Sequence, residues 1–284
     1  MFVGADELWL EMRQDSLPLH VLEYEWDGYR PSLICLDRRN DCILELGAPW
    51  LDMTVSKSKN CVGYFDGDRH IKCPSGSPVT KFSQCDSCSG ESFLPFQGCV
   101  FEPRCEGEEC DIEFCKREHV LYLALYNTRS KIGMSSTRRV ERRLIEQGAD
   151  AFSIIGSYPN RRKARSAEKD VSSRLRISQG IRQRTVLQGF TDPVDHDAME
   201  RVYRSIASSI KNCFGLSAEP LTFLEGYPIS LPLQSPPELM ETSGRHRGNP
   251  LGIKGKWLIY EDRGIRAMSL QDLVGRYLAI GPDP

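Results

Sequence analysis

Short apolar runs separated by turn-forming residues fill the first sixty positions of the chain. The runs, in which apolar and polar positions alternate, are residues 21–26, 32–36 and 42–46. A period of two is typical of strands that bury one face, and Asp27-Gly28 is a turn signal between the first two. The pattern therefore predicts a small antiparallel sheet or partial barrel at the N-terminus.

The middle of the chain mixes strand and helix patterns. Apolar runs predict strands at residues 120–126, 131–134 and 151–158. Apolar positions recur at helical spacing in residues 138–147, and Gly148 is a natural end for that helix. A second helix is expected at residues 165–176. The pattern predicts a compact α/β unit.

The last third of the chain predicts a helix at residues 193–213 and, further on, a strand at residues 251–260, with a turn at residues 261–264 and more strand after it. We read the whole as an α+β protein in which a zinc-ribbon-like region precedes a small α/β domain, with β-barrel-like elements at both ends. The predicted domains are residues 1–60 (β element), 61–118 (cysteine-rich), 119–190 (α/β) and 191–284 (helix and β element).

Composition places the chain among ordinary globular proteins. It has 284 residues, of which 40% are hydrophobic and 27% charged. No apolar run reaches the roughly 18 residues that span a bilayer, and the acidic start lacks a secretory signal pattern. We expect a cytoplasmic protein with no membrane association. In that compartment clustered cysteines bind metal more often than they form disulfides.

The net charge of −2 hides a basic segment. From Arg129 to Arg184 there are fifteen Lys or Arg and five acidic residues. A local excess of this size attracts a polyanion even when the whole chain is near neutral, although solvated helix faces are the plainer alternative. The residues expected to contact nucleic acid are Arg138, Arg139, Arg142, Arg161, Arg162, Lys163 and Arg165.

Histidine and cysteine residues form a first group at metal-ligand spacing, His70-x2-Cys73-x11-Cys85-x2-Cys88. Zinc takes four soft ligands in a tetrahedron, and two short knuckles joined by a loop of about a dozen residues supply them. The fourth place stays open between His70 and Cys61. Because such a site is closed, we expect structural rather than catalytic zinc.

A second group offers five candidates for four places: Cys99, Cys105, Cys110, Cys115 and His119. Either the four cysteines bind the ion, which is the preferred hypothesis, or His119 replaces one of them, as in Cys3His fingers. The segment 61–118 has too little apolar sequence for a core, so metal must hold it together. We predict two structural Zn²⁺ ions.

The α/β segment resembles a known nuclease domain. Strands that carry Tyr122 and Ile132-Gly133, then an Arg on the first helix and a Glu on a later one, resemble the GIY-YIG domain. A narrower similarity, to the prokaryotic family called domain of unknown function 2797, covers most of the chain. Its positions are Cys73, Phe82, Cys85, Cys88, Cys115-x3-His119-Val120-Leu121-Tyr122-Leu123-Ala124, Lys131-Ile132-Gly133, Arg143-x2-Glu146-Gln147-Gly148-Ala149, Arg161, Glu168 and Gly252-Ile253-Lys254-Gly255.

The chain departs from both patterns. Where members of the family carry Cys-x2-Cys, this chain has Cys73-Pro74-Ser75-Gly76, and His70 stands three residues earlier as a replacement ligand. Lys131 stands where the second GIY-YIG motif has its Tyr.

The resemblance implies a catalytic set of Tyr122, Lys131, Arg143 and Glu168. Tyr122 would take a proton from water, Arg143 would hold phosphate oxygens, and Glu168 would bind one Mg²⁺. Lys131 would supply a point charge. The plainer alternatives are a core tyrosine, an Arg143–Glu146 pair, and a Glu168 pair with Arg165 or Arg161.

The function expected first is a zinc protein that binds nucleic acid, with RNA favoured over DNA and tRNA or structured RNA as candidates. The alternatives are a Mg²⁺-dependent, structure-selective endonuclease acting on DNA or RNA, and a non-catalytic scaffold in RNA processing or modification. The sequence names no protein partner.

Overall fold

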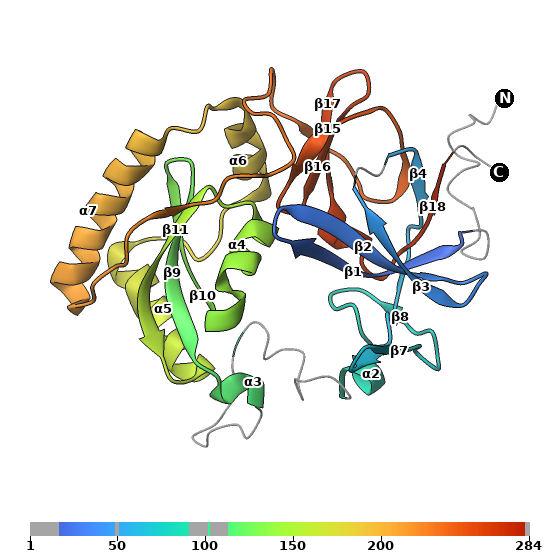
Figure 1. Ribbon diagram of the computed structural model, residues 1–284, viewed down its shortest axis with the longest axis horizontal. Helices are drawn as coiled ribbons and strands as arrows, with labels where there is room; N and C mark the ends of the chain where they lie inside the picture. The colour runs from blue at the N-terminus through green and yellow to red at the C-terminus, as the bar shows by residue number, and fades with distance from the viewer. Residues whose placement is uncertain (1–16, 49–50, 91–101, 103–112, 282–284) are drawn as a thin grey trace. The chain divides into compact units, whose positions relative to one another are not determined.

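The computed structural model describes residues 17–48, 51–90, 102 and 113–281 (Figure 1). The chain divides into two compact units: unit 1 is residues 1–97 with 238–284, and unit 2 is residues 98–237. Sheets and a few helices make up both units, so the predicted α+β class is confirmed at this level. The predicted four-part division and the named domain types remain predictions. None of the described helices is long and apolar enough to cross a membrane.

Unit 1 contains a six-stranded sheet in the order β14-β4-β18-β1-β2-β3. Its strands are β1 (Leu19–Asp27), β2 (Arg30–Asp37), β3 (Cys42–Gly47), β4 (Met53–Val55), β14 (Gly244–His246) and β18 (Tyr277–Ile280). The three strands predicted in the first sixty residues correspond to β1, β2 and β3. Because β1 pairs antiparallel with β18, the predicted N-terminal and C-terminal β elements meet in one sheet. Among the described strands this sheet does not close into a barrel.

A second, four-stranded sheet of unit 1 has the order β13-β17-β16-β15. The strands are β13 (Glu238–Leu239), β15 (Asn249–Lys254), β16 (Trp257–Glu261) and β17 (Ile265–Ser269). The single strand predicted at residues 251–260 was wrong, because the chain reverses at Gly255, whose φ of +56° suits a tight turn. The predicted turn at residues 261–264 is confirmed between β16 and β17.

The cysteine-rich part of unit 1 has little regular structure. It holds two short strand pairs and one short helix: β5 (Lys59–Asn60) with β8 (Pro78–Val79), β6 (Tyr64–Asp66) with β7 (Arg69–Ile71), and α2 (Asp86–Gly90). The 3₁₀ helix η6 (Leu270–Leu273) of unit 1 lies outside this segment, between β17 and β18. Most of residues 59–89 are partly or fully exposed, whereas Cys61 and Cys88 are buried. This distribution agrees with a segment that needs a bound ion to order it.

Unit 2 is built on a sheet in the order β10-β9-β11-β12. Its elements are α3 (Glu113–Lys116), β9 (His119–Tyr126), β10 (Arg129–Ser136), η4 (Thr137–Arg139), α4 (Val140–Gln147), β11 (Ala151–Tyr158), α5 (Arg161–Leu175), α6 (Gln183–Gln188), η5 (Gly189–Thr191), α7 (His196–Phe214) and β12 (Thr222–Phe223). Gly148 ends α4 with a φ of +76°, as predicted.

Two helix starts differ from the predictions. The α5 helix begins at Arg161 rather than Arg165, because the Asn160 side chain accepts a hydrogen bond from the Lys163 backbone and caps it. The α7 helix begins at His196 rather than Pro193, because Asp195 is its cap. Capping residues, rather than the apolar pattern, set both boundaries.

The two faces of the β9–β10 pair have different character. Leu121, Leu123 and Ile132 pack against Val171 of α5 and Ile210 of α7, and these side chains are 0–1% exposed. Since side chains alternate along a strand, Tyr122, Lys131 and Gly133 point to the opposite face. Lys131 there bonds to Gln147 of α4. The polar residues singled out in the sequence therefore gather on the α4 side of the sheet.

Candidate metal centre and polar cluster

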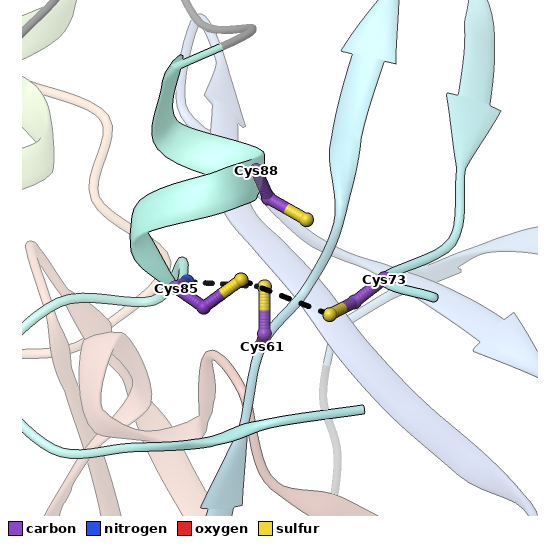
Figure 2. A group of neighbouring side chains, drawn as sticks. All are labelled: Cys61, Cys73, Cys85 and Cys88. Carbon is purple, nitrogen blue, oxygen red and sulfur yellow. Dashed lines mark hydrogen bonds between the residues drawn. The ribbon is translucent and has the colours of Figure 1, made fainter. Parts of the chain in front are cut away.

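Four cysteines of unit 1 converge on one point. The sulfurs of Cys61, Cys73, Cys85 and Cys88 all lie within 4.8 Å of one another. Cys61 follows β5, Cys73 follows β7, and Cys85 and Cys88 flank the first turn of α2. Figure 2 shows the four side chains pointing toward one another from these separate segments. Residues distant in sequence thus form a single set of sulfur ligands.

The spacing of the sulfurs fits a tetrahedral ion. Metal–sulfur bonds of about 2.3 Å give sulfur–sulfur edges of about 3.8 Å in a tetrahedron. The Cys73 and Cys85 sulfurs lie 3.8 Å apart. Four thiolates leave no position open for water or substrate, so this group could hold a structural ion such as zinc and gives no support to metal catalysis.

Backbone groups around Cys61 support a thiolate there. The Cys85 N–H donates to the Cys61 sulfur at 3.2 Å, and the Gly63 N–H donates to it at 3.4 Å. Gly63 has a φ of +75°, and a Cβ at this position would lie 2.1 Å from the Ile71 carbonyl oxygen. The turn after Cys61 therefore requires glycine, and it places two N–H groups on one sulfur.

The pKa values of the thiols indicate that four thiolates at this position need a compensating positive charge. Burial raises the pKa of Cys88, and the three neighbouring sulfurs raise it further. Burial also raises the pKa of Cys61, against the two N–H donors. Burial of Cys73 acts in the same direction, but hydrogen bonds from Ser75 and the Ser77 backbone outweigh it and lower its pKa to about 6. Four adjacent thiolates thus need a cation to compensate their charge.

His70 is not a member of this group. Its Nε2–H donates to the Val62 carbonyl oxygen at 2.6 Å, and its ring lies 5.1 Å from the ring of Phe65. Strand β7 pairs His70 with Phe65 of β6, and the imidazole contacts the ring of this neighbour in the hairpin. Cys61, which the sequence left as the alternative fourth ligand, takes the place expected for His70.

The second predicted metal group lies mostly outside the described residues, which exclude Cys99, Cys105 and Cys110. Cys115 lies in α3 and is partly buried, and His119 is buried at the start of β9. The His119 Nδ1–H donates to the Arg117 carbonyl oxygen at 2.8 Å, so Nε2 carries the lone pair. Burial lowers the pKa of His119. A neutral imidazole fixed in this way suits a metal ligand, and the second site stays a prediction.

Tyr122 and Gly133 form the centre of a polar cluster in unit 2. They are direct partners in the β9–β10 pairing, and a Cβ on Gly133 would lie 2.4 Å from the Tyr122 hydroxyl oxygen. The phenol ring therefore lies across the glycine. Tyr122 is 1% exposed, and burial raises its pKa, against the nearby guanidinium of Arg143.

Gln147 connects the remaining members of the cluster. Its Oε1 accepts a hydrogen bond from Lys131 Nζ and another, at 3.5 Å, from the Tyr126 hydroxyl. Burial and, to a smaller extent, the Arg143 charge lower the pKa of Lys131 to about 8, against the opposing effect of the Glu168 charge. Gln147 belongs to the motif that carries the family resemblance but was not predicted to be a site residue, although its position one turn beyond Arg143 on the helix was a usable signal.

Glu168 is buried and already paired. Arg165 Nη1 lies 2.5 Å from Glu168 Oε2, which matches one of the two pairings considered from the sequence. Arg165 also contacts Glu102 at 3.2 Å, and Lys169 contacts the same carboxylate at 2.5 Å. A Mg²⁺ ion at Glu168 would have to compete with the Arg165 guanidinium.

The residues predicted to contact nucleic acid differ in exposure. Arg138, Arg139, Arg142, Arg162 and Lys163 are exposed. Arg139 and Arg142 each form an ion pair with Glu146 at 3.1 Å, so Glu146 is paired with these two residues. Arg161 is 5% exposed, at the first position of α5, where its charge lowers the pKa of His119. Arg161 therefore lies inside the unit rather than on its surface.

Comparison with known proteins identifies one family. None of the curated proteins and none of the solved structures matches the chain significantly. The family described as "Protein of unknown function (DUF2797)" matches residues 50–275, a range that includes the four-cysteine group and the polar cluster. This match covers more than half of the sequence, and the chain belongs to the DUF2797 family.

Proposed function

We propose that this protein binds nucleic acid, RNA in preference to DNA, through unit 2, while a metal ion at the four cysteines gives unit 1 its structure. The observation that carries the proposal is the exposure of Arg138, Arg139, Arg142, Arg162 and Lys163, at the starts of two helices in a segment with ten more basic than acidic residues. Exposed cations of this density bind phosphates irrespective of sequence.

The preference for RNA is an analogy. Small metal-binding modules joined to basic α/β units commonly recognise folded or single-stranded RNA. In this proposal unit 2 is a GIY-YIG-like domain. Its support is that the strands of Tyr122 and Gly133 pair directly, with Arg143 on the following helix and Glu168 on α5.

A salt titration tests nucleic-acid binding. Single-stranded and hairpin RNA should bind with an affinity that falls steeply with salt, and the double variant Arg162→Glu/Lys163→Glu should flatten the slope by about 1.4 for single strands. The control is Lys57→Glu/Arg247→Glu, which makes the same charge change at exposed positions of unit 1. If both variants weaken binding equally, or if the wild-type slope is near zero, unit 2 is not the binding surface.

The polar cluster favours Mg²⁺-dependent endonuclease activity as a second candidate. Tyr122, Lys131 and Glu168 are titratable groups brought close to Arg143 from different elements, and such groups gather at active sites more often than elsewhere. Because burial raises the pKa of Tyr122, its hydroxyl is better suited to donate a hydrogen bond to phosphate than to act as a base. Arg143 would hold the phosphate oxygens.

Cleavage assays separate the two candidates. The nuclease proposal expects cutting of folded RNA or branched DNA with Mg²⁺ that Glu168→Gln and Arg143→Ala abolish. The control is Glu200→Gln with Arg204→Ala, which removes an exposed salt bridge on α7. A wild type that binds RNA and never cuts it supports a binding or scaffolding role and removes the nuclease candidate.

A further inference from the structure

A carboxylate from a distant segment lies against two basic side chains of α5. Glu102 Oε2 accepts hydrogen bonds from Nε and Nη2 of Arg165, both at 3.2 Å, and Glu102 Oε1 accepts one from Lys169 Nζ at 2.5 Å. Glu102 precedes these partners by 63 and 67 positions, and all three residues belong to unit 2. The contact therefore joins two separate segments within one unit.

Other groups hold the Arg165 guanidinium in a fixed orientation. Its Nη1 donates to Glu168 Oε2 at 2.5 Å and to Gln179 Oε1 at 2.8 Å. The Arg165 side chain is 19% exposed, and the Glu168 carboxylate that anchors it is buried. Because these bonds use both protons of Nη1, the remaining edge of the guanidinium, Nε with Nη2, is the part that meets the anion supplied by Glu102.

The arrangement of these donors suits a phosphate better than it suits Glu102. Arg165 and Lys169 are four residues apart on α5, so their side chains lie on the same face of the helix. A guanidinium edge matches two oxygens of one phosphate group, and a lysine adds a point charge. In the structure both N–H groups of the edge reach the same carboxylate oxygen at 3.2 Å, whereas charge-assisted bonds are normally about 2.7–2.9 Å long. Glu102 fills the site without matching its geometry.

The carboxylate of Glu102 is exchangeable. Its side chain is 47% exposed and that of Lys169 is 50% exposed. Hydrogen bonds from Lys169 and Arg165 lower the pKa of Glu102, against the opposing effect of burial, so the group is an anion at neutral pH. Exposed ion pairs contribute little free energy, because water and salt screen them. An anion of better geometry can therefore displace this carboxylate.

We propose that Arg165 and Lys169 form a binding site for a phosphate group, and that Glu102 occupies this site as an internal competitor. The exposed Arg162 lies one turn before Arg165 on α5, so a strand bound here would continue onto the surface proposed above to bind RNA. The phosphate belongs either to an RNA backbone or to a small phosphate compound. The first source rests on the proposed function, whereas the second does not.

Fluorescence anisotropy with a labelled single-stranded RNA and the full-length protein tests the first source. Glu102→Gln should tighten binding about three- to fivefold, the change expected when an exposed ion pair no longer competes, and should steepen the salt slope by about 0.7, which is one added phosphate contact. The control Glu200→Gln makes the same charge change in an exposed ion pair with Arg204 on α7 and should give a smaller gain. In a Lys169→Gln background the gain from Glu102→Gln should largely disappear, because half of the site is missing.

Calorimetric titration of the same variants with inorganic pyrophosphate tests the second source. Saturable binding to Glu102→Gln that Lys169→Gln removes upholds the phosphate site even when no variant binds RNA, and only the proposed function then falls. A gain confined to RNA upholds the site and identifies the backbone as the source. If Glu102→Gln and Glu200→Gln change RNA binding equally, and no pyrophosphate binding depends on Lys169, the site is overturned while the proposed function stands. Absence of both RNA and pyrophosphate binding overturns both.

Discussion

Replacing Gly133 by alanine tests the arrangement at the centre of the polar cluster. The new Cβ would lie 2.4 Å from the Tyr122 hydroxyl oxygen and 2.5 Å from Cζ of the same ring. Carbon atoms in contact are normally about 3.5–4.0 Å apart, so the new Cβ would lie about 1.0–1.5 Å too close to Cζ. Tyr122 is 1% exposed and has little free space into which to move. Overpacking of this kind costs about 1–3 kcal/mol.

Urea unfolding measures this cost. With a slope of about 1–3 kcal/mol per molar for small proteins, the midpoint should fall by about 1 M while the slope stays constant. Gly156→Ala is the matched control, because it lies on β11 of the same sheet and its Cβ would meet its nearest neighbour, in Tyr158, at an ordinary 3.4 Å. We expect the control to change stability far less.

A double-mutant cycle identifies the cause. In a Tyr122→Leu background the phenol ring is absent, so Gly133→Ala should cost little, and the coupling between the two positions should equal most of the single-variant loss. Equal destabilisation by Gly133→Ala in both backgrounds would refute the close approach of ring and glycine. Equal effects at Gly133 and Gly156 would refute it as well.

Further predictions concern the metal, the pH dependence and one ion pair. Cys61→Ser should lose the ion at the four-cysteine group while His70→Ala retains it, as zinc analysis per chain will show; the reverse result would restore His70 as the ligand. A strong chelator should lower the melting temperature of the wild type, because binding of a structural ion contributes to folding; an unchanged melting temperature would contradict a structural role. Burial lowers the pKa of His20 to about 4, against backbone hydrogen bonds, so the folded state keeps this histidine neutral. The contribution of neutral His20 to the free energy of unfolding should therefore be fully present above the unfolded pKa of about 6.5. It should fall by about 1.4 kcal/mol per pH unit as pH drops from there towards 4. The difference between the wild type and His20→Phe in urea titrations isolates this contribution from that of the thiols, and parallel pH profiles would disprove it. Arg165→Ala should destabilise by about 1–3 kcal/mol because it leaves the buried Glu168 carboxylate without its 2.5 Å partner. Arg162→Ala, at an exposed position of the same helix, should change the unfolding midpoint little, and equal losses would argue against the ion pair.

Local patterns in the sequence identified the longest of the described strands, β1, β2, β9, β10 and β11, and missed the short ones. Alternating positions in residues 21–46 and the continuous apolar run before Asn127 were sufficient, because strand patterns depend on a few neighbouring residues. The pairing of β1 with β18 was beyond this reasoning, since it joins residues that are about 260 positions apart. The break at Gly255 was missed because hydrophobic alternation continues on both sides of the turn.

The candidate sites were predicted in part for the same reason. Cys85 and Cys88 have a short-range spacing that indicates metal binding. Cys61 joins the same group from a separate turn, one that requires glycine at position 63, and no short-range spacing links it to the other ligands. The neutralisation of Glu168 by Arg165 was foreseen as an alternative from helical spacing. The burial of Arg161 was not, because charge patterns do not show which cations a helix start turns inward.

The pairing of β1 with β18 has a consequence for how the chain folds during synthesis. On the ribosome, β1 emerges early and must wait for β18, whereas all strands of unit 2 emerge between these two events. Unit 2 can therefore acquire its structure first, and the thiols of Cys61 to Cys88 can capture their ion while the sheet around them is still incomplete. Early capture would protect the waiting strands from aggregation, and late or failed loading would expose them to it.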